Sequence, residues 1–264
     1  MITSKDFAQL VSRFKAYNES LKVPDQFTQE HIDLKLKHTY HVISNIMLLA
    51  RNTGLSEPDI QLAKIIALFH DIGRFQQFIT HRTFDDTLSV NHAEFGVKIL
   101  HESGFLNGLM DDNMRALITQ AILNHNIPGV NPNPDERVLL FSRLIRDADK
   151  LDILELMTIK NVIYSILDQE DPDSYEVPYQ LYECFKHAQV VPANYAVTIN
   201  DYRLLRLSWI YDMNFPATFS LIIKRNYATK ILAKIPPSEK MGEIAVIVNQ
   251  YIGQNAGARA ISPR

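Results

Sequence analysis

A chain of 264 residues is long enough to bury a sizeable core, as one large domain or as one domain with an appended piece. Its 46% apolar and 22% charged residues are typical of ordinary globular proteins. A net charge of −3 gives no general reason to expect nucleic-acid binding, for which a basic domain would be usual.

The first helix is predicted over residues 32–50, where apolar residues recur every three or four positions. His38 shares one face of this helix with Val42 and Ile46, so its side chain is expected to point into the core. A single inward histidine is more often a core residue than a metal ligand. His38 therefore indicates a metal site only in combination with other candidate ligands.

A second helix is predicted to begin after Ser56, a capping residue followed by Pro58 in the first turn. It continues through the apolar run IIALF to His70 and Asp71, and Gly73 is expected to end it. A charged aspartate at the end of a buried helix is costly unless it is paired or bound to a cation. The alternatives are a hydrogen-bonded His–Asp pair and a helix end that reaches solvent.

Two shorter helices follow in the sequence. Asn91 and Glu94 can cap a helix with His92 in its first turn, where the helix dipole favours the neutral imidazole that binds metal. Another helix is predicted over residues 114–123, and His125 follows its end.

The segment before this pair of helices, FITHRTFDDTLSVNH, lies between two predicted ligands. Its polar residues suggest a lid, a source of the acid that protonates a leaving group, or an inert loop. These residues are His81, Arg82, Asp85 and Asp86.

A Pro- and Asn-rich loop, residues 128–136, precedes a helix predicted over residues 137–167. Asp149 is in register with Ile145 and Ile153 on this helix, so it is expected to face the core. By the same reasoning, Asp147 is expected to face solvent.

The acidic segment 168–178 contains two prolines and is the best candidate for a boundary or an exposed connection. We therefore expect a helical metal-binding domain over residues 1–167 and a C-terminal helical extension over residues 168–264, although both could form a single domain. Only residues 197–201 hint at the alternation of a strand. The predicted fold class is all-α.

Six side chains on these predicted helices together suggest a metal centre. A His–Asp pair, three further histidines and a late aspartate form a pattern typical of ligands that converge on a cation. Because Cys184 is the only cysteine, the ligands must be nitrogen and oxygen atoms, and no intramolecular disulfide can form. The predicted ligands are His38, His70, Asp71, His92, His125 and Asp149.

These motifs resemble those of the HD-domain metal-dependent phosphohydrolases, over roughly residues 30–155. In that family a first histidine lies in an H-(T/S)-x-x-V context, as His38 does in HTYHV, and a His–Asp pair follows, as in His70-Asp71. A late aspartate completes the set, as Asp149 does here. The resemblance implies a helical bundle, with additional C-terminal helices, in which these four residues bind a metal ion.

The resemblance extends to the HD-GYP branch, whose members bind two ions. HDIGR is similar to the HDIGK of that branch, and NHAEFGVKIL is similar to its T-H-P-E-I-G-A-E-I-L. His92 and His125 would then bind a second ion, with Asp71 bridging the two. The chain departs from the pattern in two places: Asn124 and Asn126 flank His125 where a second histidine is expected, and the GYP segment is missing.

The resemblance implies a hydrolase in which water bound to one or two divalent metal ions ionises near neutral pH and attacks a phosphate ester. The substrate would be a nucleotide or a small phosphorylated metabolite. Imidazole and carboxylate ligands suit iron, manganese, zinc, cobalt or nickel better than calcium, and we expect iron or manganese. The alternatives are a dinuclear-iron oxygenase resembling inositol oxygenase and a non-catalytic metal-binding sensor module.

Two basic residues are predicted to bind the substrate phosphate and to act in catalysis with Asp71. Arg74 stands where HDIGK has lysine and would offer two parallel N–H donors. Lys150 follows the predicted ligand Asp149 directly.

The N-terminus lacks the basic start and apolar stretch of a signal peptide, so a cytoplasmic protein is expected. The most apolar segment, residues 207–223, is interrupted by Asp212, Asn214 and Pro216, which favours buried helices over a membrane span. The expected partner is a small phosphorylated substrate. The tyrosine-rich region 175–202 is expected to contact a second copy of the chain or to cover the pocket.

Overall fold

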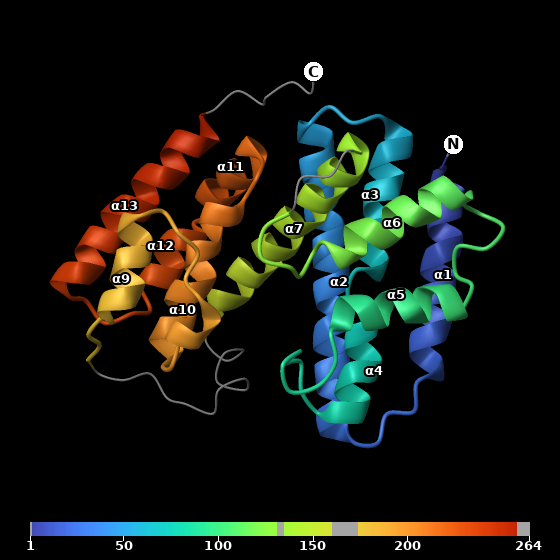
Figure 1. Cartoon of the computed structure of the whole chain (residues 1–264), viewed down its shortest axis with the longest axis horizontal. Coiled ribbons are helices and arrows are strands. Elements are labelled where there is room, and N and C mark those ends of the chain that lie inside the picture. The colour runs from blue at the N-terminus through green and yellow to red at the C-terminus, as the bar shows by residue number, and fades with distance from the viewer. Residues whose placement is uncertain (1, 131–134, 160–173, 258–264) are drawn as a thin grey trace. The chain divides into compact units, whose positions relative to one another are not determined.

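The structure is a computed structural model that describes residues 2–130, 135–159 and 174–257. Every regular element in these ranges is helical, which confirms the all-α prediction (Figure 1). The chain divides into two compact units, Met1–Ala148 and Asp149–Arg264, and the division falls inside one continuous helix, α7. The domain boundary predicted at residues 167–168 lies outside the described ranges and stays a prediction.

Within its described residues, the first unit contains six complete helices and the first part of α7. The helices are α1 (Ser4–Ser20), α2 (Gln26–Asn52), α3 (Glu57–Phe69), α4 (Ile72–His81), α5 (His92–Glu102), α6 (Asp112–Leu123) and α7 (Glu136–Met157).

Helix α3 is the centre of the first unit, because it packs against α1, α2 and α6. Ser56 caps its start by accepting a hydrogen bond from the backbone N–H of Asp59, as predicted. Its residues from Ile60 to Phe69 are buried except for Lys64, as expected for a helix that is apolar around its whole circumference. Phe14 of α1 packs edge-on against Phe69, with ring centroids 6.0 Å apart.

Gly73 does not end a helix, contrary to the prediction. Helix α3 ends before His70, and Gly73 lies in the first turn of the next helix, α4. A Cβ added at Gly73 would lie 2.3 Å from the carbonyl oxygen of His92 and 2.7 Å from the backbone nitrogen of Gly96. Glycine is therefore required for the close approach of α4 and α5, which brings His92 towards Asp71.

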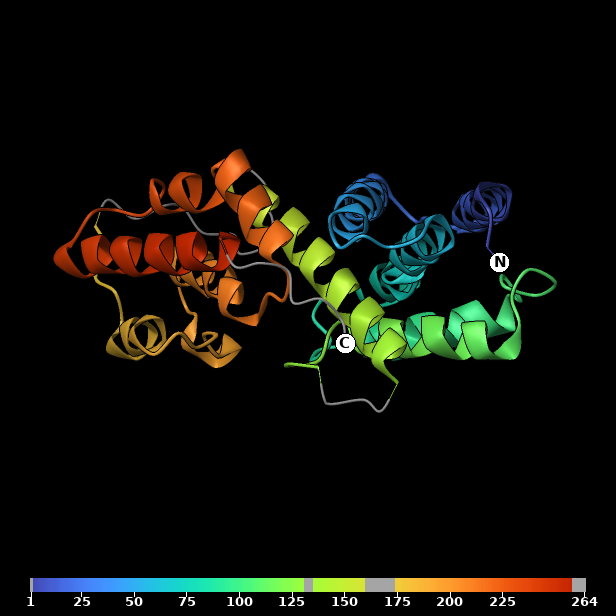
Figure 2. The same cartoon turned by 90° about the horizontal axis from the view of Figure 1, so that it is seen from above.

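Helix α5 packs against both α4 and α6 (Figure 2). Asn91 caps α5, because its side chain accepts from the backbone N–H groups of Ala93 and Glu94. His92 is consequently the first residue of the helix, as predicted.

Helix α7 ends at Met157, and residues 160–167 of the longer helix predicted here lie outside the described ranges. Asp147 is fully buried, so its predicted exposure is wrong. All residues from Leu144 to Ala148 are buried, so no side of the helix is exposed to solvent in this turn.

The second unit is also helical. After α7 the elements that the structure describes in this unit are α9 (Tyr179–Lys186), η1 (Ala193–Tyr195), α10 (Ile199–Ser208), η2 (Trp209–Asp212), α11 (Pro216–Arg225), α12 (Tyr227–Leu232) and α13 (Glu239–Ala256).

The strand suggested at residues 197–201 is absent, because Thr198 caps α10 and the helix begins at Ile199. Thr198 and Asp201 form a reciprocal capping box there, and of these two only the capping residue Thr198 has the extended backbone of a strand. Within the same unit Cys184 is buried. Among all the described residues, no helix is both long enough and apolar enough to cross a membrane.

Candidate metal centre

Three of the predicted ligands form a first group. His38 lies on α2, His70 directly follows α3, and Asp149 lies on α7. One ligand atom from each of the three falls within 4.8 Å of the others. Both histidines are buried, so their imidazoles meet away from bulk water.

The other three predicted ligands, Asp71, His92 and His125, form a second group with the same mutual spacing, and all three are buried. Asp71 lies between α3 and α4, His92 begins α5, and His125 follows α6. The structure thus brings all six predicted ligands into two neighbouring sets.

Asp71 faces both groups through different oxygens. Its Oδ2 lies 3.5 Å from Nε2 of His38 and 3.7 Å from Nε2 of His70. Its Oδ1 lies 3.3 Å from Nε2 of His92 and 3.7 Å from Nε2 of His125. One carboxylate with one oxygen turned towards each group has the arrangement expected of a bridging ligand.

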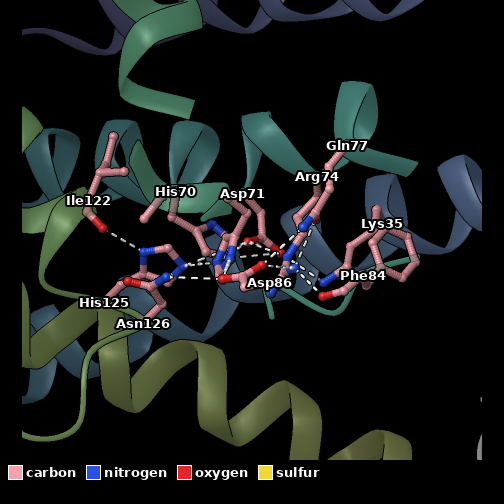
Figure 3. A network of polar contacts seen from close by, with 12 residues as sticks. Lys35, His70, Asp71, Arg74, Gln77, Phe84, Asp86, Ile122, His125 and Asn126 are labelled. Atoms are coloured by element: carbon pink, nitrogen blue, oxygen red, sulfur yellow. Dashed lines mark hydrogen bonds and ion pairs between the residues drawn. The ribbon is translucent and has the colours of Figure 1, made fainter. Parts of the chain in front are cut away.

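Two of the imidazoles are oriented by the ends of the helices that carry them. Nδ1 of His70 donates to the carbonyl of Ala67 at 2.8 Å. Nδ1 of His125 donates to the carbonyl of Ile122 at 2.5 Å, a contact shown in Figure 3. The last carbonyls of a helix have no partner within it, so each imidazole satisfies one of them. Because a carbonyl only accepts, the proton of each ring is on Nδ1, which leaves Nε2 as the ligand atom.

His92 is oriented by a carboxylate instead. Its Nδ1 donates to Oδ2 of Asp86 at 2.6 Å. Burial lowers the pKa of His92 to about 4, so this imidazole is neutral at physiological pH. Burial raises the pKa of Asp86, but the hydrogen bond from His92 and the charge of Arg74 outweigh it and hold that pKa well below the usual range. A neutral His92 that donates from Nδ1 directs the lone pair of Nε2 towards Asp71.

The second group fits a metal ion on the basis of its donor atoms. Nε2 of His92 and Nε2 of His125 lie 3.0 Å apart, and both point towards Asp71 Oδ1. When both rings carry their proton on Nδ1, three acceptors converge on one buried point, which is repulsive unless a cation or an extra proton lies among them. Imidazole nitrogen and carboxylate oxygen suit a divalent transition metal.

The comparison with protein families agrees with this geometry. Residues 36–154 match the HD domain family, and this range includes all six predicted ligands. This part of the chain is an HD domain. HD domains are generally metal-dependent hydrolases that bind divalent metal ions, and the two His/Asp groups are the corresponding candidate sites. The match gives no support to the HD-GYP branch in particular, and no curated protein or solved structure matches the chain significantly.

A cation beside the two ligand groups that the sequence did not single out is Lys35. Its Nζ lies 2.8 Å from Oδ2 of Asp71, and its side chain is mostly buried (Figure 3). Burial opposes ionisation of Asp71, but the charge of Lys35 helps to hold its pKa well below the usual range. Lys35 lies three residues before His38, and this shared helical face is the signal that could have indicated it.

The predicted phosphate-binding residues have other partners in the structure. Arg74 Nη1 donates to Gln77, to the carbonyl of Phe84 and to Asp86, while its Nε lies 3.7 Å from Asp71 Oδ1. Lys150 forms an ion pair with Asp212 at 2.5 Å. Binding of phosphate by Arg74 or Lys150 stays a prediction.

Proposed function

We propose that this HD domain is a phosphohydrolase that hydrolyses a phosphate ester of a nucleotide or a small phosphorylated metabolite, using two divalent metal ions. The observation that carries the proposal is the position of Asp71 between two groups of imidazoles, with one carboxylate oxygen turned to each. A pair of ions sharing one carboxylate is typical of enzymes that transfer or hydrolyse phosphoryl groups.

In this proposal each ion has its own ligands. His38, His70 and Asp149 would hold the first ion with Asp71 Oδ2, and His92 and His125 would hold the second with Asp71 Oδ1. We propose iron or manganese, because imidazole ligands suit iron and carboxylate ligands suit manganese. A bound divalent ion lowers the pKa of its water and would thereby provide a hydroxide nucleophile closer to neutral pH.

Positive charge beside the ligands favours an anionic substrate. The ammonium of Lys35 and the guanidinium of Arg74 approach opposite oxygens of Asp71, at 2.8 Å and 3.7 Å. When the carboxylate is engaged by metal, both cations can turn to the phosphoryl oxygens of a substrate. We propose Lys35 as the stronger partner, because Arg74 already donates to three acceptors.

The test begins with protein purified without oxygen. Its metal content is measured, the most abundant metal is restored, and phosphomonoesters and phosphodiesters are screened in anoxic buffer. Release of phosphate or of a phosphomonoester, lost on chelation and regained with metal, is the expected result.

The same screen separates the alternative functions. Activity that appears only when dioxygen is admitted would replace the proposal with an oxygenase. A metal-loaded protein that turns over neither kind of substrate would favour a sensor module.

A further inference from the structure

The carboxylate of Asp86 is surrounded by donors although it belongs to none of the ligand groups. Its Oδ1 accepts from Arg74 Nη1 at 2.8 Å and from Gln77 Nε2 at 3.0 Å (Figure 3). Its Oδ2 accepts from Nδ1 of His92 at 2.6 Å and from Nδ2 of Asn126 at 3.3 Å. The shortest of these four contacts is the one with the imidazole.

We propose that Asp86 is a positioning residue that fixes the ring of His92 and thereby determines the affinity for the second metal ion. This inference rests on the two-ion function proposed above. A carboxylate that accepts from the far nitrogen of a metal-binding imidazole fixes its tautomer and orientation and raises its basicity. Asp86 would do this for His92 in the same way that backbone carbonyls do it for His70 and His125.

Asp86 can perform this role because the loop that carries it is anchored to α4. Gln77 is fully buried, and its Nε2 contacts the loop at the hydroxyl of Ser89 and the carbonyl of Val90 as well as at Asp86. Arg74 adds a bond to the carbonyl of Phe84. The loop is therefore held at both ends, and the carboxylate has little freedom to leave the imidazole.

The neighbouring residue Asp85 offers a matched control. It lies in the same loop and is also hydrogen-bonded, but its carboxylate accepts from the backbone and hydroxyl of Thr87. Asp85→Asn removes one negative charge and perturbs the turn, whereas Asp86→Asn removes the charge that faces His92. A difference between the two variants reports on the contact with the imidazole.

The experiment titrates metal-free wild type, Asp86→Asn and Asp85→Asn with Mn²⁺ by calorimetry. For wild type and Asp85→Asn we expect two ions per chain. For Asp86→Asn we expect the first ion with unchanged affinity and the second weakened by about 10–100-fold. Retention of the first ion also shows that the variant is folded.

A second measurement does not depend on metal. Long-range ¹H–¹⁵N correlation spectra of the metal-free proteins report which nitrogen of each imidazole carries the proton. We expect His92 to be protonated on Nδ1 in wild type and in Asp85→Asn, and to be a mixture of tautomers in Asp86→Asn.

The outcomes separate the two proposals. Two ions of wild-type affinity in Asp86→Asn, with the His92 tautomer unchanged, would overturn the role of Asp86 and leave the proposed function intact. A wild-type protein that binds fewer than two ions would overturn the two-ion function, and the role of Asp86 with it.

Discussion

The two ligand groups differ in what holds their side chains in place. The first draws its ligands from α2, from the end of α3 and from α7, which are helices of 27, 13 and 22 residues. The second depends on the end of α6, on the first residue of α5 and on the loop that carries Asp86. A site built on long helices tolerates local change better than one that includes a loop, so the second ion is expected to be the more easily lost.

The largest effect is expected where the two groups share a residue. Asp71→Ala should abolish binding of both ions and lower turnover by more than about 100-fold. Losing a residue that only hydrogen-bonds to a metal ligand typically costs about 10–100-fold, and losing the ligand itself should cost more. Elemental analysis and the phosphate screen measure the two effects. Asp33→Ala, an exposed carboxylate on α2, is the control. Full metal content in Asp71→Ala would refute the shared site.

The next comparison removes one histidine from each group. His125→Ala should leave one ion per chain with its affinity intact, whereas His70→Ala should remove the first ion. Titration of both variants with Mn²⁺ tests this difference. Equal losses in the two variants would mean that the groups act as one site.

The approach of α4 to α5 can be tested at Gly73. Gly73→Ala should lower the free energy of unfolding by about 1–3 kcal/mol, because the added Cβ collides with backbone atoms. It should also weaken binding of the second ion more than binding of the first, since the atom nearest to the added Cβ is the carbonyl oxygen of His92.

A glycine in open space provides the control for Gly73. A Cβ added at Gly242 on α13 meets nothing within 4 Å, so Gly242→Ala should raise the free energy of unfolding by about 0.5–1 kcal/mol. Urea unfolding of both variants gives the comparison. A Gly73→Ala variant that unfolds at the same urea concentration as wild type and binds two ions would show that α4 and α5 do not need glycine at this contact.

The smallest expected effect comes from the helix caps. Ser56→Ala and Asn91→Ala should each cost about 1 kcal/mol of stability by removing an N-cap. Only Asn91→Ala should also weaken binding of the second ion, because Asn91 accepts a hydrogen bond from Asn126, the neighbour of His125. Identical metal affinities in the two variants would show that the cap of α5 has no influence on the site.

Much of the fold and of the candidate site could be predicted from the sequence. The caps at Ser56 and Asn91 and the inward face of His38 depend on local patterns, and the structure has them where expected. The convergence of the six ligands could be predicted because the spacing of the motifs resembles that of a known family.

The remainder depends on contacts between distant segments. A glycine after an apolar helical run is typical of a helix end. Gly73 is instead required by the close approach of the Gly96 backbone, which lies too far away in the sequence for a local pattern to reveal it. Lys35 reaches Asp71 across 36 positions of sequence, and only its spacing of three residues from His38 distinguishes it from Lys37. In the sequence Asp86 is one of several polar residues in a loop, and only the structure shows that it contacts His92.

The bonds from His70 and His125 to the carbonyls of Ala67 and Ile122 couple metal binding to the integrity of two helix termini. Fraying of the last turn of α3 or α6 would release an imidazole, so occupancy by metal must suppress that fraying by mass action. Metal-loaded protein should therefore show slower amide exchange and slower proteolysis at these two termini than metal-free protein. Chelation of both ions would expose both termini.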